Sequence, residues 1–429
     1  MEASGEQQAV RDAALEPGAL DRVTLWAFFG LLTAYTLLIG DHSHIGVWLT
    51  TAVFFILAAF YLFIQRGRAL HLTAPFFCPA AMAIYGVVQT LWSDQKIVYA
   101  GWERTLFWFT AAGIGLLGTQ LFQWRKFTQQ FRIGLIAFAS FIALLDLLQQ
   151  ASHTGSYFWL FPSGYSDIFG TFAYHNNFAQ FIELTLPITL WEGIRRHEVR
   201  LQYVLLAALQ FGAVVASGSR AGSGLVVVEF IAVLILVFFR GRESMSIAVA
   251  ALALVLTASA TYLAGVDRIA AKLRNHDQLA ARRQINEASL DMIKARPLTG
   301  WGLGSYVPVY KAFARFDDGT WINQAHNDYF EWAAEGGIPF ACLMVVLIVW
   351  SVRPAIRSVW GIGLLAMCIH AAVDYPFARL GTCAWYFALA GMVSARGGNE
   401  PQIERRRARR RRRHRMEMED EPANVSPSM

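Results

Sequence analysis

The stretch AHNDYF places a histidine, an amide and a carboxylate in three successive positions, His326, Asn327 and Asp328. A histidine can hold or take a proton near pH 7, and the amide or carboxylate beside it can cap a helix or orient the ring. Arginines stand at Arg220, in SGSRAG, and at Arg282, in RRQINEASLDMIKA. Guanidinium groups bind phosphate oxygens in a bidentate manner. If these residues lie on one face of the protein, their types predict a diphosphate site with a proton acceptor beside it.

Other polar residues stand where apolar runs begin or end. His175 and Asn176 open one run, and His370 and Asp374 close another. Taken singly, a histidine there is more often a cap, and an arginine in a turn is more often an interface anchor. They nevertheless indicate a site, because the topology described below places all of them on the same side of the membrane. For Glu183, inside an apolar run, a helix–helix hydrogen bond and a role in a site explain the residue equally well.

The elements that must carry these residues are membrane helices. Of 429 residues, 55% are hydrophobic and 16% are charged, against about 25% charged in a soluble domain, and the mean hydropathy is +0.37. The net charge of +6 comes from one tract, RRRARRRRRHR, because removing its nine arginines leaves −3. The four cysteines lie in or beside apolar runs without paired spacing, so we expect neither a disulfide framework nor a zinc site.

A transmembrane helix needs about 20 apolar residues, and the chain has twelve candidate spans. They are 23–40, 46–64, 74–92, 105–122, 133–150, 176–194, 201–217, 223–239, 246–264, 337–352, 357–373 and 381–395. With a cytoplasmic N-terminus, the inner loops QRGR, QWRKFTQQFR, IRRHEVR, FRGRES and VRPAIR are all basic. The outer loops DHSH and 151–174 contain no Lys or Arg, so the alternation agrees with the rule that positive loops face inward.

This pattern divides the chain into five parts. They are a cytoplasmic segment (1–22), nine spans (23–264), an outer loop (265–336), three spans (337–395) and a cytoplasmic Arg-rich tail (396–429). Within the outer loop, residues 282–295 carry a loose helical apolar stripe, which predicts a helix that ends at Pro297 and Gly300. Gly336 and Gly337 then let the chain turn into the tenth span.

Several strings resemble, in order, the motifs of the O-antigen ligase and polymerase superfamily. They are FAYHNNFAQFIELTLPITL, SGSRAG, RRQINEASLDMIKARPLTGWGLGSY, AHNDYFEWAAEGGIPF and HAAVDYPF, which together span about residues 165–380. The pairing of the pattern P-x-x-G-x-G-x-G with HND, followed by a glycine-rich entry to a span, is the most specific part. One departure is Asn286, where the family often has Trp.

The resemblance implies an all-α polytopic membrane protein of about twelve helices, with a long, partly helical periplasmic loop and the C-type membrane glycosyltransferase architecture. It also implies a bacterial inner membrane protein whose active site faces the periplasm. The activity would be inverting glycosyl transfer from an undecaprenyl-diphosphate-linked glycan to a lipid or glycan acceptor such as lipid A-core. A polysaccharide polymerase of the same superfamily is the first alternative, and a transporter of lipid-linked glycans is the second.

The same resemblance assigns roles to residues. His326, Arg220 and Arg282 match the family's catalytic positions, with Arg283 as the alternative to Arg282. His326 would either take the proton of the acceptor or hydrogen-bond to the acceptor or diphosphate and orient it. Substrate-binding residues would be Arg283, His175, Asn176, Glu183, Asn327, Asp328, Gly302, Gly304, His370 and Asp374.

We expect no metal and no other cofactor. No D-x-D sequence occurs in an outer loop, and Asp317, Asp318 and Gly319 are more typical of a turn. For the Arg-rich tail we expect anionic membrane lipid as the partner, and not nucleic acid, because the tail follows a series of membrane spans.

Overall fold

The computed structural model describes residues 17–38, 45–67, 69–92, 98–152, 156–162, 168–196, 198–238, 277–315 and 322–397. Several predictions lie outside these residues. They concern most of the N-terminal segment, the ninth span at 246–264, the turn at Asp317–Gly319 and the Arg-rich tail.

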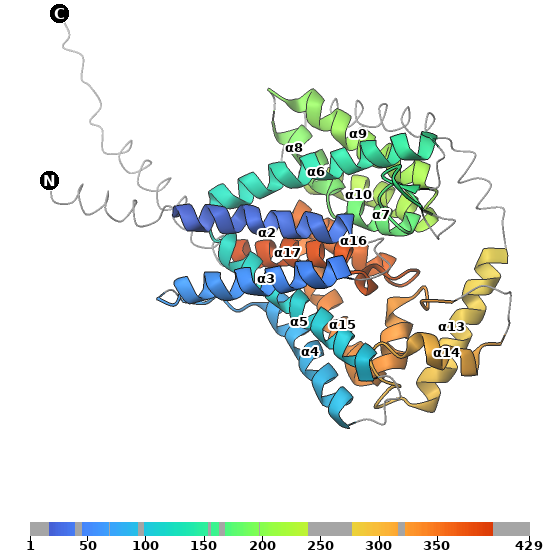
Figure 1. Cartoon of the computed structure of the whole chain (residues 1–429). Coiled ribbons are helices and arrows are strands. Elements are labelled where there is room, and N and C mark those ends of the chain that lie inside the picture. The colour runs from blue at the N-terminus through green and yellow to red at the C-terminus, as the bar shows by residue number, and fades with distance from the viewer. Residues whose placement is uncertain are drawn as a thin grey trace, which may run out of the picture.

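The described chain is a bundle of helices with one small hairpin (Figure 1). The first half contains α2 (Ala19–Leu37), α3 (Ile45–Ile64), α4 (Ala74–Trp92), α5 (Val98–Leu121), α6 (Arg125–Ser152), α7 (His175–Glu183), α8 (Leu186–Arg195), α9 (Arg200–Ser217) and α10 (Arg220–Phe238). The second half contains α13 (Asp277–Ala295), α14 (Tyr306–Phe313), α15 (Asp328–Arg357), α16 (Val359–His370), the 3₁₀ turn η1 (Pro376–Ala378) and α17 (Leu380–Gly397). The strands β1 (Ser156–Tyr157) and β2 (Phe161–Pro162) pair antiparallel.

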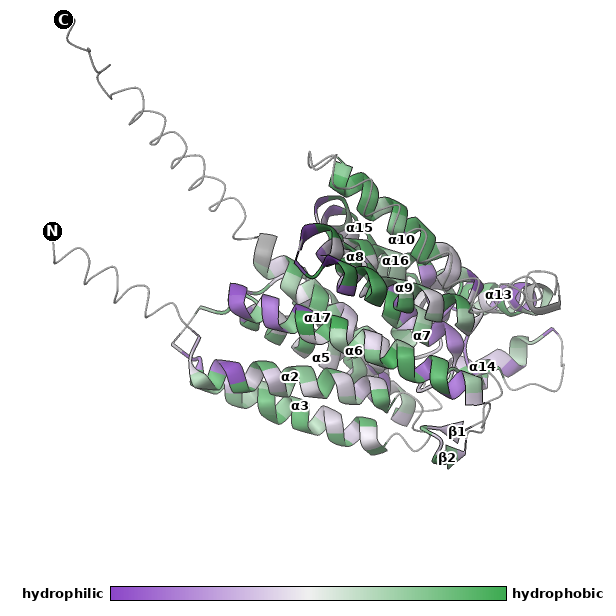
Figure 2. Ribbon diagram, turned by 90° about the horizontal axis from the view of Figure 1, so that it is seen from above, coloured by the Kyte–Doolittle hydropathy of each residue, from purple (hydrophilic) through white to green (hydrophobic). Residues whose placement is uncertain are grey.

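The composition of these helices makes the chain an all-α multi-pass membrane protein. Among the described residues, six helices are long and apolar enough to cross a membrane, namely α3, α4, α6, α9, α10 and α15. Two shorter apolar helices coincide with α16 and α17. Large apolar side chains such as Ile56 and Val349 are 70% and 66% exposed, as expected of a surface covered by lipid. Hydrophobic residues are spread along most of the helices of the bundle (Figure 2). The number of spans, twelve, stays a prediction.

The predicted sixth span, 176–194, is two helices and not one. Helix α7 ends at Glu183, and α8 begins at Leu186. Pro187 lies in the first turn of α8, where its missing N–H costs no helical hydrogen bond. At the break, Gly363 of α16 packs so closely that a Cβ there would lie 2.4 Å from the carbonyl oxygen of Glu183. The backbone at the break is therefore covered by α16.

Helix α15 begins earlier than the predicted tenth span. It starts at Asp328, nine residues before the predicted start, and it bends at Gly337, whose φ is 71°. A Cβ on Gly337 would lie 2.5 Å from the carbonyl oxygen of Leu298, so this glycine lets the loop pack against the bend. The predicted turn therefore exists as a non-helical break at Gly337, which divides α15 into a first part in the loop region and a second part in the predicted span.

The predicted loop helix exists as α13, which packs with α14 against α15 at one end of the bundle (Figure 1). Its apolar stripe of Ile285, Ala288 and Met292 is buried in a small core of its own. Ser289 and the Tyr306 hydroxyl share a hydrogen bond of 2.8 Å at the centre of that core. This packing fixes the beginning of α13, where Arg282 lies, against the end of the bundle.

Candidate functional site

Asp374 lies at the centre of a cluster of polar side chains drawn from four parts of the chain. It is fully buried in the turn between α16 and η1. One carboxylate oxygen accepts the N–H of Tyr375 at 3.0 Å and lies 3.4 Å from Nδ1 of His326. The other accepts from the Asn176 amide and lies 3.8 Å from the Arg282 guanidinium. A buried carboxylate needs such partners, because burial without them is costly.

These partners keep Asp374 ionised. Burial alone raises the pKa of its carboxyl group, but the neighbouring His326 acts in the opposite direction, as do the charges of Arg282 and His370. Together they outweigh burial and lower the pKa of Asp374 to about 2. The cluster therefore contains one permanent anion at neutral pH.

The guanidinium group of Arg282 is held by two hydrogen bonds. One nitrogen of its guanidinium donates to the carbonyl of Val373 at 2.9 Å, and another donates to the Tyr174 hydroxyl at 3.1 Å. Burial acts to lower the pKa of Arg282, but Asp374 and Tyr174 outweigh it and raise that pKa. The side chain is 27% exposed, so part of a fixed cation faces the solvent.

Arg220 adds a second cation near the first. It is the first residue of α10, directly after a turn in which Gly218 has a φ of 74° and Ser219 bonds to the N–H of Gly222. A Cβ on Gly222 would lie 2.5 Å from that of Ala179, so the glycine allows α10 to approach α7 closely. Arg220 is close enough to Arg282 and Tyr174 for their charges to act on it. Two neighbouring guanidinium groups repel each other, and a dianion bound between them would relieve that repulsion.

His326 has a strained backbone conformation. Its ring packs against two tyrosines. Its φ is 50°, in the left-handed region that a residue with a side chain rarely adopts. The ring is edge-on to Tyr174 and Tyr375 at centroid distances of 5.9 and 5.2 Å, and these tyrosines stack on each other at 5.7 Å. The His326 side chain is 25% exposed. Because Nδ1 faces Asp374, Nε2 on the opposite side of the ring faces away from it.

A second ionisable pair lies beneath the cluster. Nδ1 of His370 is 2.7 Å from a carboxylate oxygen of Glu183, and both side chains have no exposed surface. The charge of His370 acts on Asp374. Because both side chains are fully buried, neither lines the surface of the site in this structure. The pair instead acts on Asp374 from the interior of the bundle.

The remaining predicted residues have different places. His175 begins α7 with its ring 4.5 Å from that of Tyr174. Asn327 caps α15, where its side chain accepts the N–H of Phe330 at 3.2 Å. Asp328 accepts the N–H of Phe377 at 2.9 Å, and its own N–H bonds to the carbonyl of Asp374 at 3.1 Å. Asn327 and Asp328 thus hold the turn that carries Asp374.

Arg283 points away from the cluster. It is exposed and pairs with Glu287 one turn later on α13 at 3.1 Å. Of the two adjacent arginines that the sequence offered, the structure therefore brings only Arg282 to Asp374.

The glycines of the P-x-x-G-x-G-x-G pattern allow the loop to pack closely against neighbouring helices. Gly300, Gly302 and Gly304 all have positive φ, and a Cβ on Gly300 or Gly304 would lie 2.2 or 2.7 Å from a backbone carbonyl oxygen. The loop therefore lies flush against α15 and α5. Gly302 and Gly304 do not contact the cluster around Asp374 in any contact described for them.

Sequence reasoning missed Gln89 and Tyr375. The Gln89 side chain, on α4, donates to the carbonyls of Thr299 and Glu335 and accepts the N–H of Leu303 at 3.0 Å. A glutamine inside an apolar helix was the available signal. Tyr375 carried no such signal, because a tyrosine at the end of a membrane helix is common.

Residues 205–345, about a third of the chain, match the family model described as O-antigen ligase. The match contains Arg220, Arg282 and His326, while Asn176 and Asp374 lie outside it. No curated protein was found to match the chain. This part of the chain is therefore similar to the O-antigen ligase family, and it lies within a multi-pass membrane protein.

Proposed function

We propose that this protein transfers a glycan from undecaprenyl diphosphate to an acceptor, as an O-antigen ligase does. The observation that carries the proposal is the cluster in which Arg282 and His326 both lie at the buried anion Asp374, with Arg220 close to Arg282. The family match agrees with this type of activity. The site would face the periplasm of a bacterial inner membrane, where such lipid-linked glycans are used.

The two arginines bind the diphosphate of the donor and stabilise the charge that develops as it leaves. Arg282 is pre-oriented by Val373, Tyr174 and Asp374, so it needs no rearrangement during the reaction. Fixed cations aimed at developing charge are among the largest contributors to enzymatic rate. Diphosphate is a good leaving group, and charge stabilisation is the main help that it needs.

The acceptor hydroxyl oxygen forms a bond to the anomeric carbon while the bond from that carbon to the diphosphate oxygen breaks. The configuration inverts, and the electron pair leaves with undecaprenyl diphosphate. The hydroxyl proton goes to Nε2 of His326. Asp374 supports this role, because an anion facing Nδ1 favours the tautomer that is protonated there and leaves Nε2 free to accept.

Deletion of the gene followed by gel profiling of surface glycans tests the function. We expect loss of long chains from lipopolysaccharide and accumulation of carrier-linked polymer, both reversed by the wild-type gene and not by a gene carrying Arg282→Ala. Accumulation of single carrier-linked repeat units would instead identify a polymerase. An unchanged profile of every surface glycan would contradict the proposal.

A further inference from the structure

The β1–β2 hairpin presents a group of large apolar side chains at its tip, residues 158–161. Trp159, Leu160 and Phe161 are all exposed, Leu160 to 74%. The hairpin follows α6 and lies at the same end of the bundle as α13 and α14 (Figure 2). A contiguous group of apolar side chains is costly in water, so it marks a surface that another molecule covers.

The backbone of the tip is unusual for residues of this size. Phe158 and Trp159 have φ angles of 51° and 61°, in the left-handed region that bulky residues rarely adopt. Among the described residues, His326 is the other non-glycine residue with a positive φ. Strain of this kind persists where neighbouring contacts hold it, and it often serves a function. Here large apolar residues stand where a tight turn usually has Gly or Asn.

Gln149, near the end of α6, fixes the tip in this conformation. Its buried side chain donates to the carbonyl of Gly170 at 3.0 Å and accepts the N–H of Phe158 at 3.1 Å. The indole N–H of Trp159 donates to the hydroxyl of Ser152 at 2.7 Å. The tip is therefore attached to the end of α6, and its apolar side chains cannot turn inward without breaking these hydrogen bonds.

The tip lies where the lipid-facing side of α6 ends. Phe141, Leu144 and Leu148 of this membrane-capable helix are exposed, and their spacing of three and four residues places them on one face. Ser152 follows Leu148 by four residues and so stands on the same face. Because Trp159 bonds to Ser152, its ring lies at the end of this apolar stripe.

The position of Ser152 on α6 predicts the depth of the tip. Four residues of helix rise about 6 Å, so Ser152 lies about 6 Å beyond Leu148. The headgroup layer is about that thick, because a bilayer measures about 40–45 Å with a hydrocarbon core of about 30 Å. Aromatic side chains favour this layer. The hydrocarbon core is excluded, because the open edges of a two-stranded hairpin need water for their backbone N–H and C=O groups.

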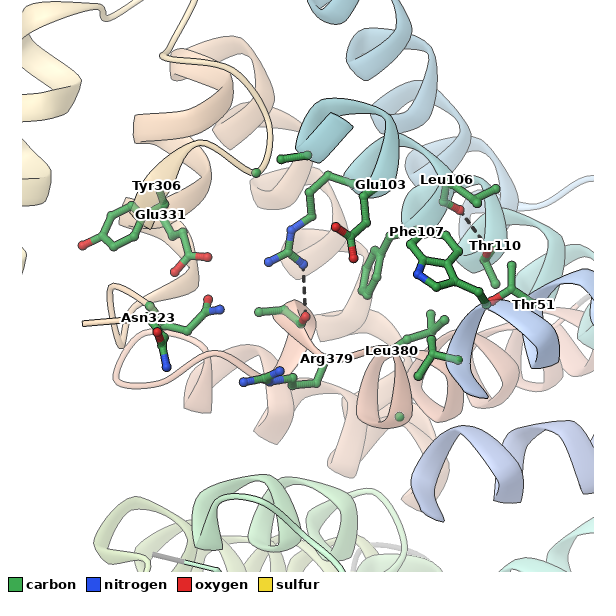
Figure 3. Close-up of a pocket in the computed structure, with 18 of the residues that line it drawn as sticks. Thr51, Glu103, Leu106, Phe107, Thr110, Tyr306, Asn323, Glu331, Arg379 and Leu380 are labelled. Carbon is green, nitrogen blue, oxygen red and sulfur yellow. Dashed lines mark hydrogen bonds between the residues drawn. The ribbon is translucent and has the colours of Figure 1, made fainter. Parts of the chain in front are cut away.

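Charge also distinguishes the hairpin from other parts of the predicted outer side. Residues 156–162, SYFWLFP, contain no charged side chain. On the same side, Glu103, Arg379 and Asn323 gather around a cavity of about 380 Å³ (Figure 3). Charged groups of that kind need hydration, whereas an uncharged tip enters a lipid headgroup layer without desolvating a charge.

We propose that the hairpin tip lies in the lipid headgroup layer on the outer side of the membrane and anchors the protein at that depth. Its partner is the lipid surface, and not a second copy of this chain or another protein. The anchor extends to the cluster around Asp374, because Gly170 leads from Gln149 into α7, whose Asn176 donates to Asp374. Glycan transfer is not required for this anchoring.

The first test measures the depth of the tip for the full chain in nanodiscs. Leu160→Cys carries an environment-sensitive fluorophore in a Cys342→Ser chain, whose other cysteines are buried. We expect a lipid nitroxide near the headgroup to quench this label at least about twofold more than a nitroxide at the end of the acyl chain. Two control labels use the same background. Aqueous iodide should quench Lys294→Cys, which is exposed on α13, and the acyl-chain nitroxide should quench Val345→Cys, which is exposed on the second part of α15.

Three results of this test would overturn the assignment. Iodide quenching of the Leu160→Cys label as strong as that of the Lys294→Cys label would place the tip in water. Protection from iodide and from both nitroxides would show that a protein covers the tip. Strongest quenching by the acyl-chain nitroxide would place the tip in the hydrocarbon core.

A second test needs no label. Leu160→Glu should lower the Tm of the full chain in nanodiscs by several degrees, because the carboxylate loses hydration and the apolar contact of leucine is lost. Leu160→Trp should keep the Tm of the wild type, because tryptophan favours the headgroup layer. An unchanged Tm in both variants would show a tip in water, and an equal fall in both would show a tip packed against protein. Either result would overturn the assignment.

Discussion

A carboxylate oxygen of Asp374 lies 3.4 Å from Nδ1 of His326, and the other oxygen of the same carboxylate lies 3.8 Å from Arg282. One buried anion therefore positions both a cation and the proposed proton acceptor. Neither partner precedes Asp374 closely in sequence, and their meeting depends on α13 and α15 packing against the turn after α16.

Asp374→Asn should lower the rate of glycan transfer on the order of 10²-fold, because the neutral amide no longer sets the His326 tautomer or holds Arg282. The measurement is the initial rate at saturating donor. Asp291→Asn is the matched control, since Asp291 pairs with Arg315 and Lys294 at the surface of α13. Equal activity of the two variants would remove Asp374 from the mechanism.

Arg282→Ala should lower the transfer rate by about 10²–10³-fold, as expected when a fixed charge-stabilising group is lost. Arg282→Lys should recover only part of it, because an ammonium group cannot bond to Val373, Tyr174 and a phosphate in the same fork geometry. Arg283→Ala should keep full activity, because that guanidinium pairs with Glu287 on the exposed face. The reverse order of the two alanine variants would show that the wrong arginine has been assigned.

His326→Asn separates the backbone requirement from the chemistry of the ring. Asparagine tolerates a positive φ better than most residues, so the Tm should stay close to that of the wild type. The transfer rate should nevertheless fall by about 10²–10⁴-fold, since the proton acceptor is gone. A variant that unfolds earlier and also loses activity would not separate the two effects, so His326→Gly serves as a second check of the fold. Substantial activity in a folded His326→Asn protein would rule out the base role.

Gly300→Ala should destabilise the fold by about 2 kcal/mol or more, because the new methyl group meets the carbonyl oxygen of Glu335 at a φ of 61°. Thermal unfolding in detergent measures the effect. Gly30→Ala on α2 is the control, because a Cβ there meets nothing within 4 Å. If both variants unfold at the wild-type temperature, the loop does not lie flush against α15.

The pH dependence of stability follows from the lowered pKa of Asp374. Its folded value is about 2, against about 3.9 for an unfolded carboxyl. The ionised group thus stabilises the fold above the unfolded value, and this contribution is lost as pH falls toward the folded value. The Tm difference between wild type and Asp374→Asn should be constant from about pH 5 to about pH 8 and shrink below about pH 4. A difference that changes between about pH 6 and about pH 8 would point to another group.

Apolar runs predicted many of the helices among the described residues, because a membrane helix needs a long apolar segment. The spans predicted at 46–64 and 74–92 correspond closely to α3 and α4. The break between α7 and α8 had a signal in the sequence that was overlooked, since Pro187 has no N–H to donate to the carbonyl of Glu183. The structure adds the close approach of Gly363 to that carbonyl. The partner that covers the break lies far away in the chain.

The residues of the cluster were predictable by type and by resemblance. Which of them contact one another was not predictable. Asp374 stood among ten possible substrate-binding residues, and nothing in the sequence singled it out as the common partner of His326, Arg282 and Asn176. Tyr375 and Gln89 were missed, because their importance comes from what they touch and not from unusual chemistry. Whether these residues take part in glycan transfer stays a prediction that the variants above can test.

Asp374 follows both Arg282 and His326 in the chain, and this order has a consequence for biosynthesis. Arg282 and His326 are made and inserted before the residue that anchors them, since Asp374 follows α16. A nascent or truncated chain that stops before this turn carries both groups without their common anion. We therefore expect the cluster to assemble only after the turn that follows α16 has been inserted and has packed against α13 and α15.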